Sequence, residues 1–139
     1  MPENDCLFCR IIAGEIPADL VHQDESCIVI RDLNPQAPTH VLIIPREHME
    51  SLDDASHRDE PMLGHLLRVA ARIANDEGHG ESGYRTVINT GAGSGQSVFH
   101  LHVHVMPRHD GVALLPPASR KEDAKVLEEN AAKLMAALK

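Results

Sequence analysis

Three histidines that alternate with apolar residues are the most chemically suggestive feature of this sequence. His100, His102 and His104 stand two residues apart within the segment 98–108. Such alternation is typical of a half-buried β-strand, whose successive side chains point to opposite faces. The pattern therefore predicts three imidazoles on one face of a strand, each about 6.6 Å from the next. We expect the other face to enter the core with four side chains: Phe99, Leu101, Val103 and Val105.

A row of imidazoles is compatible with two kinds of chemistry. Neutral imidazole is a common metal ligand, and it also serves as a nucleophile or as a general acid or base near neutral pH. A single strand histidine is usually only a half-buried residue, but packing does not favour three titratable rings over valine or threonine. Spacing alone leaves metal binding and catalysis open.

The segment 89–97 before this strand is rich in glycine. Glycines let a backbone approach an anion closely and present successive N–H groups to it. The segment lacks the Gly-Lys-Ser/Thr of a Walker A loop, and it leads into a strand instead of a helix. Phosphate binding and simple loop flexibility both remain possible interpretations.

Cys6 and Cys9 form a Cys-x-x-Cys pair near the start of the chain. Such a pair indicates zinc when two further ligands are available, and no thioredoxin-like βαβ pattern surrounds it to favour redox chemistry. The alternative is that both are small buried apolar residues. Cys27 lies in an apolar run, and we interpret it as an inert core residue.

Composition limits the classes of function. The chain has 139 residues, enough for one domain, and a formal net charge of −8 without a cluster of Lys or Arg. This argues against nucleic-acid binding, which depends on cationic patches. The first residues are polar and acidic, unlike a signal peptide, and no apolar run is long enough to span a membrane. We expect a cytoplasmic protein.

Periodicity and turn residues predict the elements that position these groups. The first are a helix over 6–12 capped by Asp5 and ending near Gly14, a hairpin of 19–22 with 27–31, a loop over 32–38, and a strand over 39–44 ended by Pro45. The main helix lies between Asp59 and Gly78, and a strand covers 85–88. The expected stripe of the main helix is Leu63, Leu66, Leu67, Ala70, Ile73 and Ala74.

A last helix is expected after a capping box of Ser119 and Glu122. Its apolar stripe must lie on the core or on a partner; it consists of Ala124, Leu127, Ala131, Leu134 and Leu138. The histidines outside the row share no spacing, and we interpret them as surface residues: His22, His57, His65, His79 and His109.

Asn89 followed by the segment 95–108 resembles the His-φ-His-φ-His-φ-φ motif of the histidine triad (HIT) family, where φ is apolar. The segments 6–18 and 32–45 resemble the Hint branch of that family, and the motifs stand in family order over about residues 5–110. The tail from Gly111 onward departs from the short, Trp-containing end of better-known Hint proteins.

This resemblance implies an α+β fold: an antiparallel sheet of about five strands with one main helix, a short N-terminal helix and a C-terminal helix. Residues 1–110 are expected to form the HIT catalytic domain, and 111–139 an extension with a helix in the same domain. The resemblance also implies a homodimer, with the long helix and the sheet edge at its interface.

The activity implied by the family is transfer of a nucleoside monophosphate to a histidine and then to water. The substrates implied are purine nucleoside phosphoramidates or related AMP esters. His102 matches the nucleophile, and the carbonyl of His100 matches the acceptor that holds its ring. His104 and Ser97 match groups that contact the phosphate and assist the leaving group, and His40 matches a histidine beneath the triad.

The binding residues implied by the family fall into three groups. Asn89, Gly95 and Gln96 match the phosphate loop, and Asp32 matches the carboxylate that holds the ribose hydroxyls. The apolar purine pocket is matched by Leu7, Phe8, Ile11, Ile30 and Leu33. A structural zinc site is matched by Cys6, Cys9, His48 and His100.

Three other functions stay open. Met106-Pro107-Arg108 also resembles the Fhit branch, which implies hydrolysis of dinucleoside polyphosphates. A non-catalytic purine nucleotide-binding protein would bind AMP without hydrolysis. A metalloenzyme would use all three histidines on a catalytic metal, which gives no reason for the glycine-rich approach to the strand.

Overall fold

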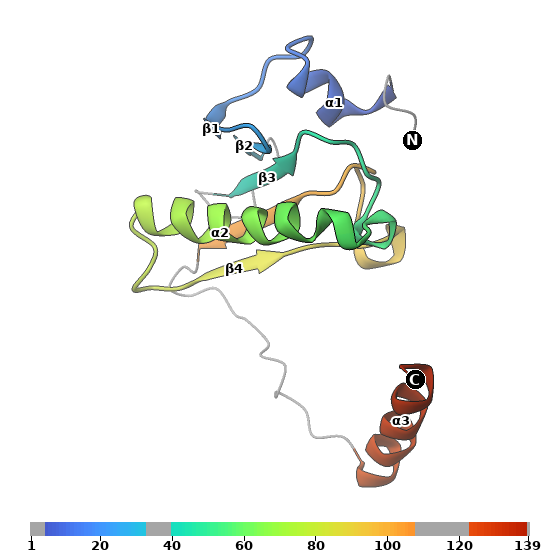
Figure 1. Cartoon of the computed structure of the whole chain (residues 1–139). Helices are drawn as coiled ribbons and strands as arrows, with labels where there is room; N and C mark the ends of the chain where they lie inside the picture. Colours follow the sequence, from blue (N-terminus) through green and yellow to red (C-terminus); the bar gives the residue numbers. More distant parts are fainter. Residues whose placement is uncertain (1–4, 33–39, 108–122, 139) are drawn as a thin grey trace.

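An antiparallel sheet of five strands forms the centre of the structure (Figure 1). The computed structural model describes residues 5–32, 40–107 and 123–138. The strand order is β1-β2-β3-β5-β4, with the strands β1 (Leu20–Gln23), β2 (Cys27–Arg31), β3 (Val41–Pro45), β4 (Tyr84–Val87) and β5 (Val103–Pro107). The α+β class and the five-stranded antiparallel sheet are confirmed. Of the predicted loop over 32–38, only Asp32 is among the described residues, so Leu33 lies outside them.

Three α-helices accompany the sheet: α1 (Leu7–Ile12), α2 (Glu60–Asp76) and α3 (Ala124–Ala137). Short 3₁₀ turns follow β3 and precede β5: η2 (Leu52–Asp54), η3 (His57–Asp59) and η4 (Ala92–Ser94). The expected main helix agrees closely with α2, which begins with Pro61 in its first turn.

Of the two predicted N-terminal caps, Asp5 was wrong, whereas Asp59 does stand at the N-cap position of α2. Cys6, not Asp5, caps α1, because its sulfur accepts the N–H of Cys9 at 3.3 Å. Asp59 precedes α2 but makes no side-chain bond to it. Its carboxylate instead accepts the N–H of Ser56 at 2.9 Å, within the capping box of η3.

The two faces of the sheet bury different apolar clusters. Helix α2 covers one face, and its buried side chains (among them Leu66 and Ile73) pack with Val29, Val103 and Val105. On the other face, α1 contributes Phe8 to a second cluster, which also contains Ile28, Ile30, Leu42 and Ile44. Since side chains alternate along a strand, His104 lies on the α1 face, opposite Val103 and Val105. His102, just before β5, contacts Phe8 of α1 and so lies on the same face.

The histidine strand is shorter than predicted. Strand β5 begins at Val103, and residues 98–102 are irregular backbone. The ladder between β3 and β5 reaches only to the pair Ile43–Val103. Beyond it, the ring of His100 donates to the carbonyl of Pro45 at 2.8 Å, and the N–H of Leu101 donates to the carbonyl of Met49 at 2.8 Å. These bonds replace the strand pairing that alternation predicts.

Core positions were mostly predicted correctly. Leu101, Val103 and Val105 are buried, whereas Phe99 is only half-buried and belongs to neither cluster. Leu67 was wrongly placed in the stripe of the main helix, because it is 50% exposed while Val69 faces the sheet instead.

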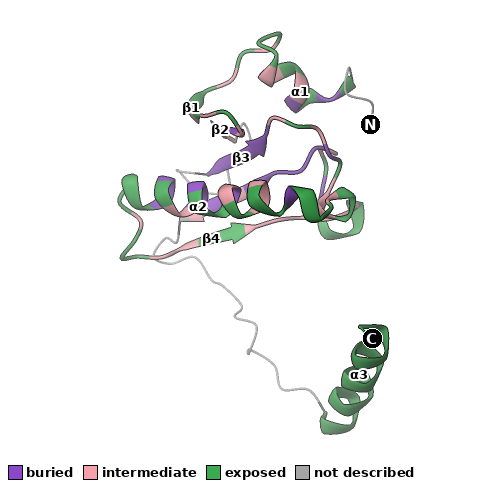
Figure 2. Cartoon of the chain, in the orientation of Figure 1, coloured by how far each residue is buried: buried purple, intermediate pink, exposed green. Residues whose placement is uncertain are grey.

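Helix α3 is exposed along its whole length (Figure 2). Its expected apolar stripe therefore does not pack on the core: Leu127, Leu134 and Leu138 are all exposed. Asp123 caps the helix through the N–H of Lys125 at 2.8 Å, while the predicted capping box of Ser119 and Glu122 lies outside the described residues. A partner for the stripe stays a prediction. Among the described residues, no helix meets the length and hydropathy needed to cross a membrane.

The contrast between Leu66 and Leu67 gives a direct test of the packing. Leu66 is 1% exposed beneath α2, so Leu66→Ala leaves a cavity and is expected to lower the free energy of unfolding by about 2–5 kcal/mol. Leu67→Ala, on the exposed side of the same turn, is the matched control and should change it by less than about 1 kcal/mol. Urea denaturation of both variants measures the difference, and equal losses would contradict this orientation of α2.

Candidate active site

The ring of His102 is held in one orientation by the backbone beside it. Its Nδ1 lies 2.7 Å from the carbonyl oxygen of His100. A carbonyl only accepts hydrogen bonds, so Nδ1 carries the hydrogen and Nε2 keeps an unprotonated lone pair. Phe8 of α1 meets the ring edge-on, with centroids 5.0 Å apart. His102 is thus a buried, oriented imidazole with one basic nitrogen.

His104 is linked to Asp32 through His40. The Nε2 of His40 lies 3.3 Å from a carboxylate oxygen of Asp32 and 2.9 Å from Nδ1 of His104. An ionised carboxylate only accepts, so Nε2 of His40 carries a hydrogen that it donates toward both neighbours. The Nδ1 of His104 then accepts, and its Nε2 is a donor. His40 therefore lies beside His104 of the histidine row.

Burial favours the neutral forms of three rings: His102, His104 and His40. Burial lowers the pKa of His102, although its bond to the carbonyl of His100 opposes the shift. Burial, followed by the nearby rings of His102 and His40, lowers the pKa of His104 to about 4. Burial also lowers the pKa of His40, against the charge of Asp32. Neutral imidazoles predominate at pH 7, as nucleophilic chemistry requires.

A cavity of about 330 Å³ opens beside His104. Its lining residues are His40, Arg85, Val87, Asn89, Ser94, Gly95, His104 and Met106. The structure therefore brings together four residues singled out in the sequence, His40, Asn89, Gly95 and His104, although they come from three segments. Sequence analysis missed Arg85. In the register of β4 and β5, Arg85 pairs with Met106 and Val87 with His104, so the pairing of the strands would have identified it.

The glycine-rich loop is organised mainly by its own hydrogen bonds. Gly95 has a φ of +106°, a conformation that favours glycine. The buried side chain of Gln96 accepts the N–H of Gly91 at 2.8 Å and donates to the carbonyl of Glu50 at 2.6 Å. The N–H groups of Gly95 and Gln96 bond to loop carbonyls, at 3.1 and 3.2 Å. Gln96 thus fixes the loop, whereas Ser97 beside it is exposed.

Three of the residues predicted to form a purine pocket pack in one apolar cluster. Phe8 and Ile30 are buried in the α1-side cluster, and Ile11 is half-buried against it. Leu7 is 37% exposed and lies outside that cluster, and Leu33 lies outside the described residues. Phe8 therefore joins the apolar cluster to the ring of His102.

Cys6, Cys9, His48 and His100 lie close enough to hold a metal ion. The Nδ1 of His100 is 3.3 Å from the sulfur of Cys6, and the Nδ1 of His48 is 3.2 Å from the sulfur of Cys9. Ligand atoms around a tetrahedral zinc ion stand about 3.3–3.8 Å apart. Because Nε2 of His100 donates to the carbonyl of Pro45, its Nδ1 keeps a lone pair toward the cluster. The donor set and its geometry fit zinc.

The three triad histidines do not share one metal site. Their ring nitrogens form no common group among the described residues, because His100 groups with Cys6, Cys9 and His48, and His104 groups with Asp32 and His40. The nitrogen of His102 that bears a hydrogen is turned to a carbonyl. The geometry therefore favours a nucleophile at His102 over a three-histidine catalytic metal.

The sheet, with its row of neutral histidines and a cavity beside them, defines a protein suited to nucleophilic chemistry on a small ligand. The profile of the HIT domain matches residues 13–111. The chain therefore belongs to the HIT domain family. It is 45% identical over 103 residues to the purine nucleoside phosphoramidase of Escherichia coli, a match that covers 74% of this chain and 87% of that protein.

Two solved structures show the same likeness. A HIT family hydrolase from Legionella pneumophila is 40% identical with a TM-score of 0.73, covering 84% of this chain and all of that one. A histidine triad protein from Clostridium difficile is 36% identical with a TM-score of 0.76, covering 82% of this chain and 99% of that one. The resemblance drawn from the sequence is confirmed.

Titration of the rings tests the electrostatics of the site. NMR titration of the imidazoles should give a pKa near 4 for His104 and a value below 6.5 for His102, because both rings are buried. Asp32→Asn should lower both values further, since the carboxylate of Asp32 favours their charged forms. A His104 pKa at or above 6.5, or an upward shift in the variant, would contradict the geometry.

Proposed function

We propose that this protein hydrolyses purine nucleoside phosphoramidates or related AMP esters through a nucleotidyl-histidine intermediate. The observation that carries the proposal is the bond between Nδ1 of His102 and the carbonyl of His100, 2.7 Å long. It leaves an unprotonated Nε2 on a buried ring beside His104. The homology to a protein named purine nucleoside phosphoramidase supports this substrate class.

Catalysis would proceed in two displacements at phosphorus. Nε2 of His102 forms a bond to phosphorus as the bond to the leaving amine or alcohol breaks. The leaving group takes a proton from Nε2 of His104 or the hydroxyl of Ser97. Water then attacks phosphorus and gives a proton back to the group that protonated the leaving group. The phosphorus–His102 bond breaks, and AMP leaves with His102 neutral again. The carbonyl of His100 stabilises the positive charge that His102 carries in between.

The remaining site residues would bind the nucleotide. Asp32 would hold the ribose hydroxyls, while Leu7, Phe8, Ile11, Ile30 and Leu33 would form the purine pocket. Asn89 and Gly95 line the cavity and would contact the phosphate. Gln96 would hold the glycine-rich loop in place. Arg85, which lines the same cavity, adds positive charge toward an anionic substrate.

Zinc bound by Cys6, Cys9, His48 and His100 would have a structural role. These residues would join α1 to the segment that carries the triad, and so keep Phe8 against His102. A homodimer formed through α2 and the sheet edge, and a cytoplasmic location, are part of the same proposal.

Removal of the nucleophile tests the mechanism. His102→Asn should reduce kcat to background, because no other ring presents an oriented basic nitrogen to phosphorus, while AMP affinity changes little. Turnover of an AMP–amine conjugate, AMP binding by calorimetry and a thermal melt measure the three quantities. Activity within tenfold of the unaltered protein would remove His102 from the mechanism. AMP binding by the unaltered chain without any turnover would favour the non-catalytic alternative.

The substrate class is tested separately. We expect a higher kcat/KM for an AMP–amine conjugate than for diadenosine polyphosphates, since the likeness to the phosphoramidase is extensive. The reverse order, measured at equal substrate concentrations, would favour dinucleoside polyphosphate hydrolysis. His102→Asn should abolish either activity and so provides the control.

The zinc site is tested by elemental analysis of protein purified without chelators. Cys9→Ser should lose one zinc per chain and melt at a lower temperature, because a structural metal stabilises the fold. His57→Gln, which alters an exposed histidine outside this cluster, is the matched control and should keep every ion. Equal zinc in the unaltered chain and Cys9→Ser, or no change in melting, would contradict the assignment.

A further inference from the structure

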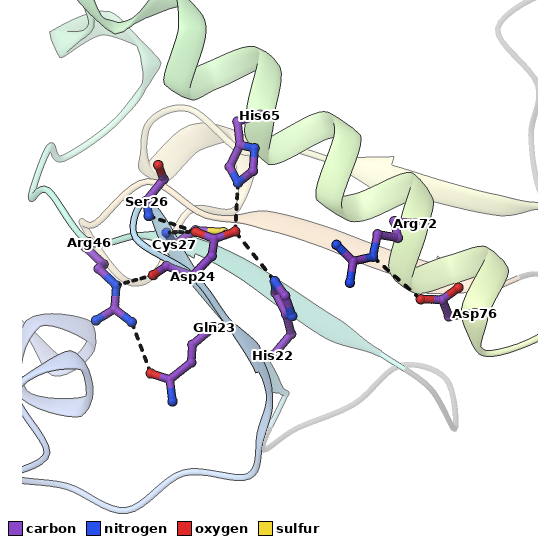
Figure 3. Close-up of polar contacts among 9 residues, drawn as sticks. All are labelled: His22, Gln23, Asp24, Ser26, Cys27, Arg46, His65, Arg72 and Asp76. Carbon is purple, nitrogen blue, oxygen red and sulfur yellow. Dashed lines mark hydrogen bonds and ion pairs between the residues drawn. The ribbon is translucent and has the colours of Figure 1, made fainter.

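A second cluster of side chains that could hold a metal ion is drawn in Figure 3. It lies on the face of the sheet that α2 covers, away from the histidine triad. It consists of Asp24 in the turn between β1 and β2, Cys27 at the start of β2, and His65 on α2. Cys27 packs in the α2-side apolar cluster, whereas Phe8, which contacts His102, packs on the opposite side. The two sites are therefore separated by the sheet.

The carboxylate of Asp24 is held ready at this position. Its Oδ1 accepts the N–H groups of Ser26 and Cys27 at 2.8 and 2.9 Å. Its own carbonyl accepts from Nε of Arg46 at 2.7 Å, which fixes the turn. Because these bonds hold the turn and occupy Oδ1, Oδ2 remains as an oriented ligand oxygen.

A nitrogen and a sulfur approach Oδ2 of Asp24. Nε2 of His65 lies 2.8 Å from Oδ2, and the sulfur of Cys27 lies 3.6 Å from it. All three ligand atoms lie within 4.8 Å of one another. Nε2 of His22 approaches the same oxygen to 3.5 Å from β1. Figure 3 shows His22 and His65 pointing at Asp24 from different elements.

This donor set has a clear chemical preference. Thiolate and imidazole ligands suit zinc and other borderline transition ions, whereas Mg²⁺ and Ca²⁺ need oxygen ligands. His22 and His65 were interpreted from the sequence as surface residues and Cys27 as inert core. Their convergence on Asp24 comes from three segments of chain and requires the packing of α2 on the hairpin.

We propose that Asp24, Cys27 and His65 bind one zinc-class divalent ion, with His22 or water as the fourth ligand. The ion takes the place of the hydrogen between Nε2 of His65 and Asp24, and the neutral ring then carries its hydrogen on Nδ1. Cys27 coordinates as a thiolate whose proton passes to solvent. The ion would join α2 to the β1–β2 hairpin.

Metal stoichiometry of the full-length chain tests the proposal. Protein dialysed against Zn²⁺ and then metal-free buffer should contain one more ion per chain than Asp24→Asn or His65→Gln. Asp24→Asn keeps an oxygen for the N–H groups of Ser26 and Cys27 and should retain the turn. His57→Gln, a fully exposed histidine just before α2, is the matched control and should keep every ion. The test depends on the difference, so it holds whether or not the Cys6–Cys9 cluster is filled.

The absorption of bound Co²⁺ distinguishes a metal site from an ion pair between His65 and Asp24, because an ion pair alone does not change that absorption. The chain loaded with Co²⁺ should show thiolate-to-cobalt absorption that falls by one thiolate's share in Cys27→Ser. His65→Gln, which leaves the buried core unaltered, should lose the same component. If the variants and the unaltered chain bind equal amounts of Zn²⁺, or their cobalt spectra agree, then Asp24 and His65 form an ion pair only and the proposal is overturned.

Discussion

The arrangement of the site depends on the environment of one residue, His100, whose side chain is completely buried. Its carbonyl accepts the hydrogen of His102, its Nε2 donates to the carbonyl of Pro45, and its Nδ1 faces Cys6 and Cys9. Each of these contacts determines the next: the bond to Pro45 fixes the tautomer, and the tautomer leaves a lone pair toward the sulfurs. The residue that begins the triad thereby connects the sheet, α1 and the oriented ring of His102.

The sheet separates two kinds of polar chemistry. On the α1 face, burial keeps His102 and His104 neutral, which suits a nucleophile beside a proton donor. On the α2 face, Asp24 is charged because hydrogen bonds outweigh its burial. Burial thus keeps the histidine rings neutral where few hydrogen bonds favour their charged form. At Asp24, several hydrogen-bond donors keep the carboxylate charged. Alternation along β5 assigns His104 to the α1 face, whereas Asp24 owes its place to the turn between β1 and β2.

Helix α3 shows that an amphipathic sequence pattern does not by itself predict packing. Its apolar stripe was recognised correctly as amphipathic, and its helical state is confirmed. Its side chains are nevertheless exposed, with Leu134 at 63% and Leu138 at 85%. Amphipathicity establishes that a helix has a face to bury, but it does not specify the surface that buries it.

The sequence by itself determined the class of fold, the family and most residues of the site, because short-range rules of alternation, turn residues and motif order are written along the chain. The resemblance to the HIT family added predicted site residues, His40, Asn89, Gly95, His102 and His104, and four residues that do lie close enough to hold a metal. Only the tertiary structure decided that β5 begins at Val103, that Arg85 lines the cavity, and that Asp24, Cys27 and His65 meet. These features depend on strand register and on helix packing between distant segments, which no local pattern records.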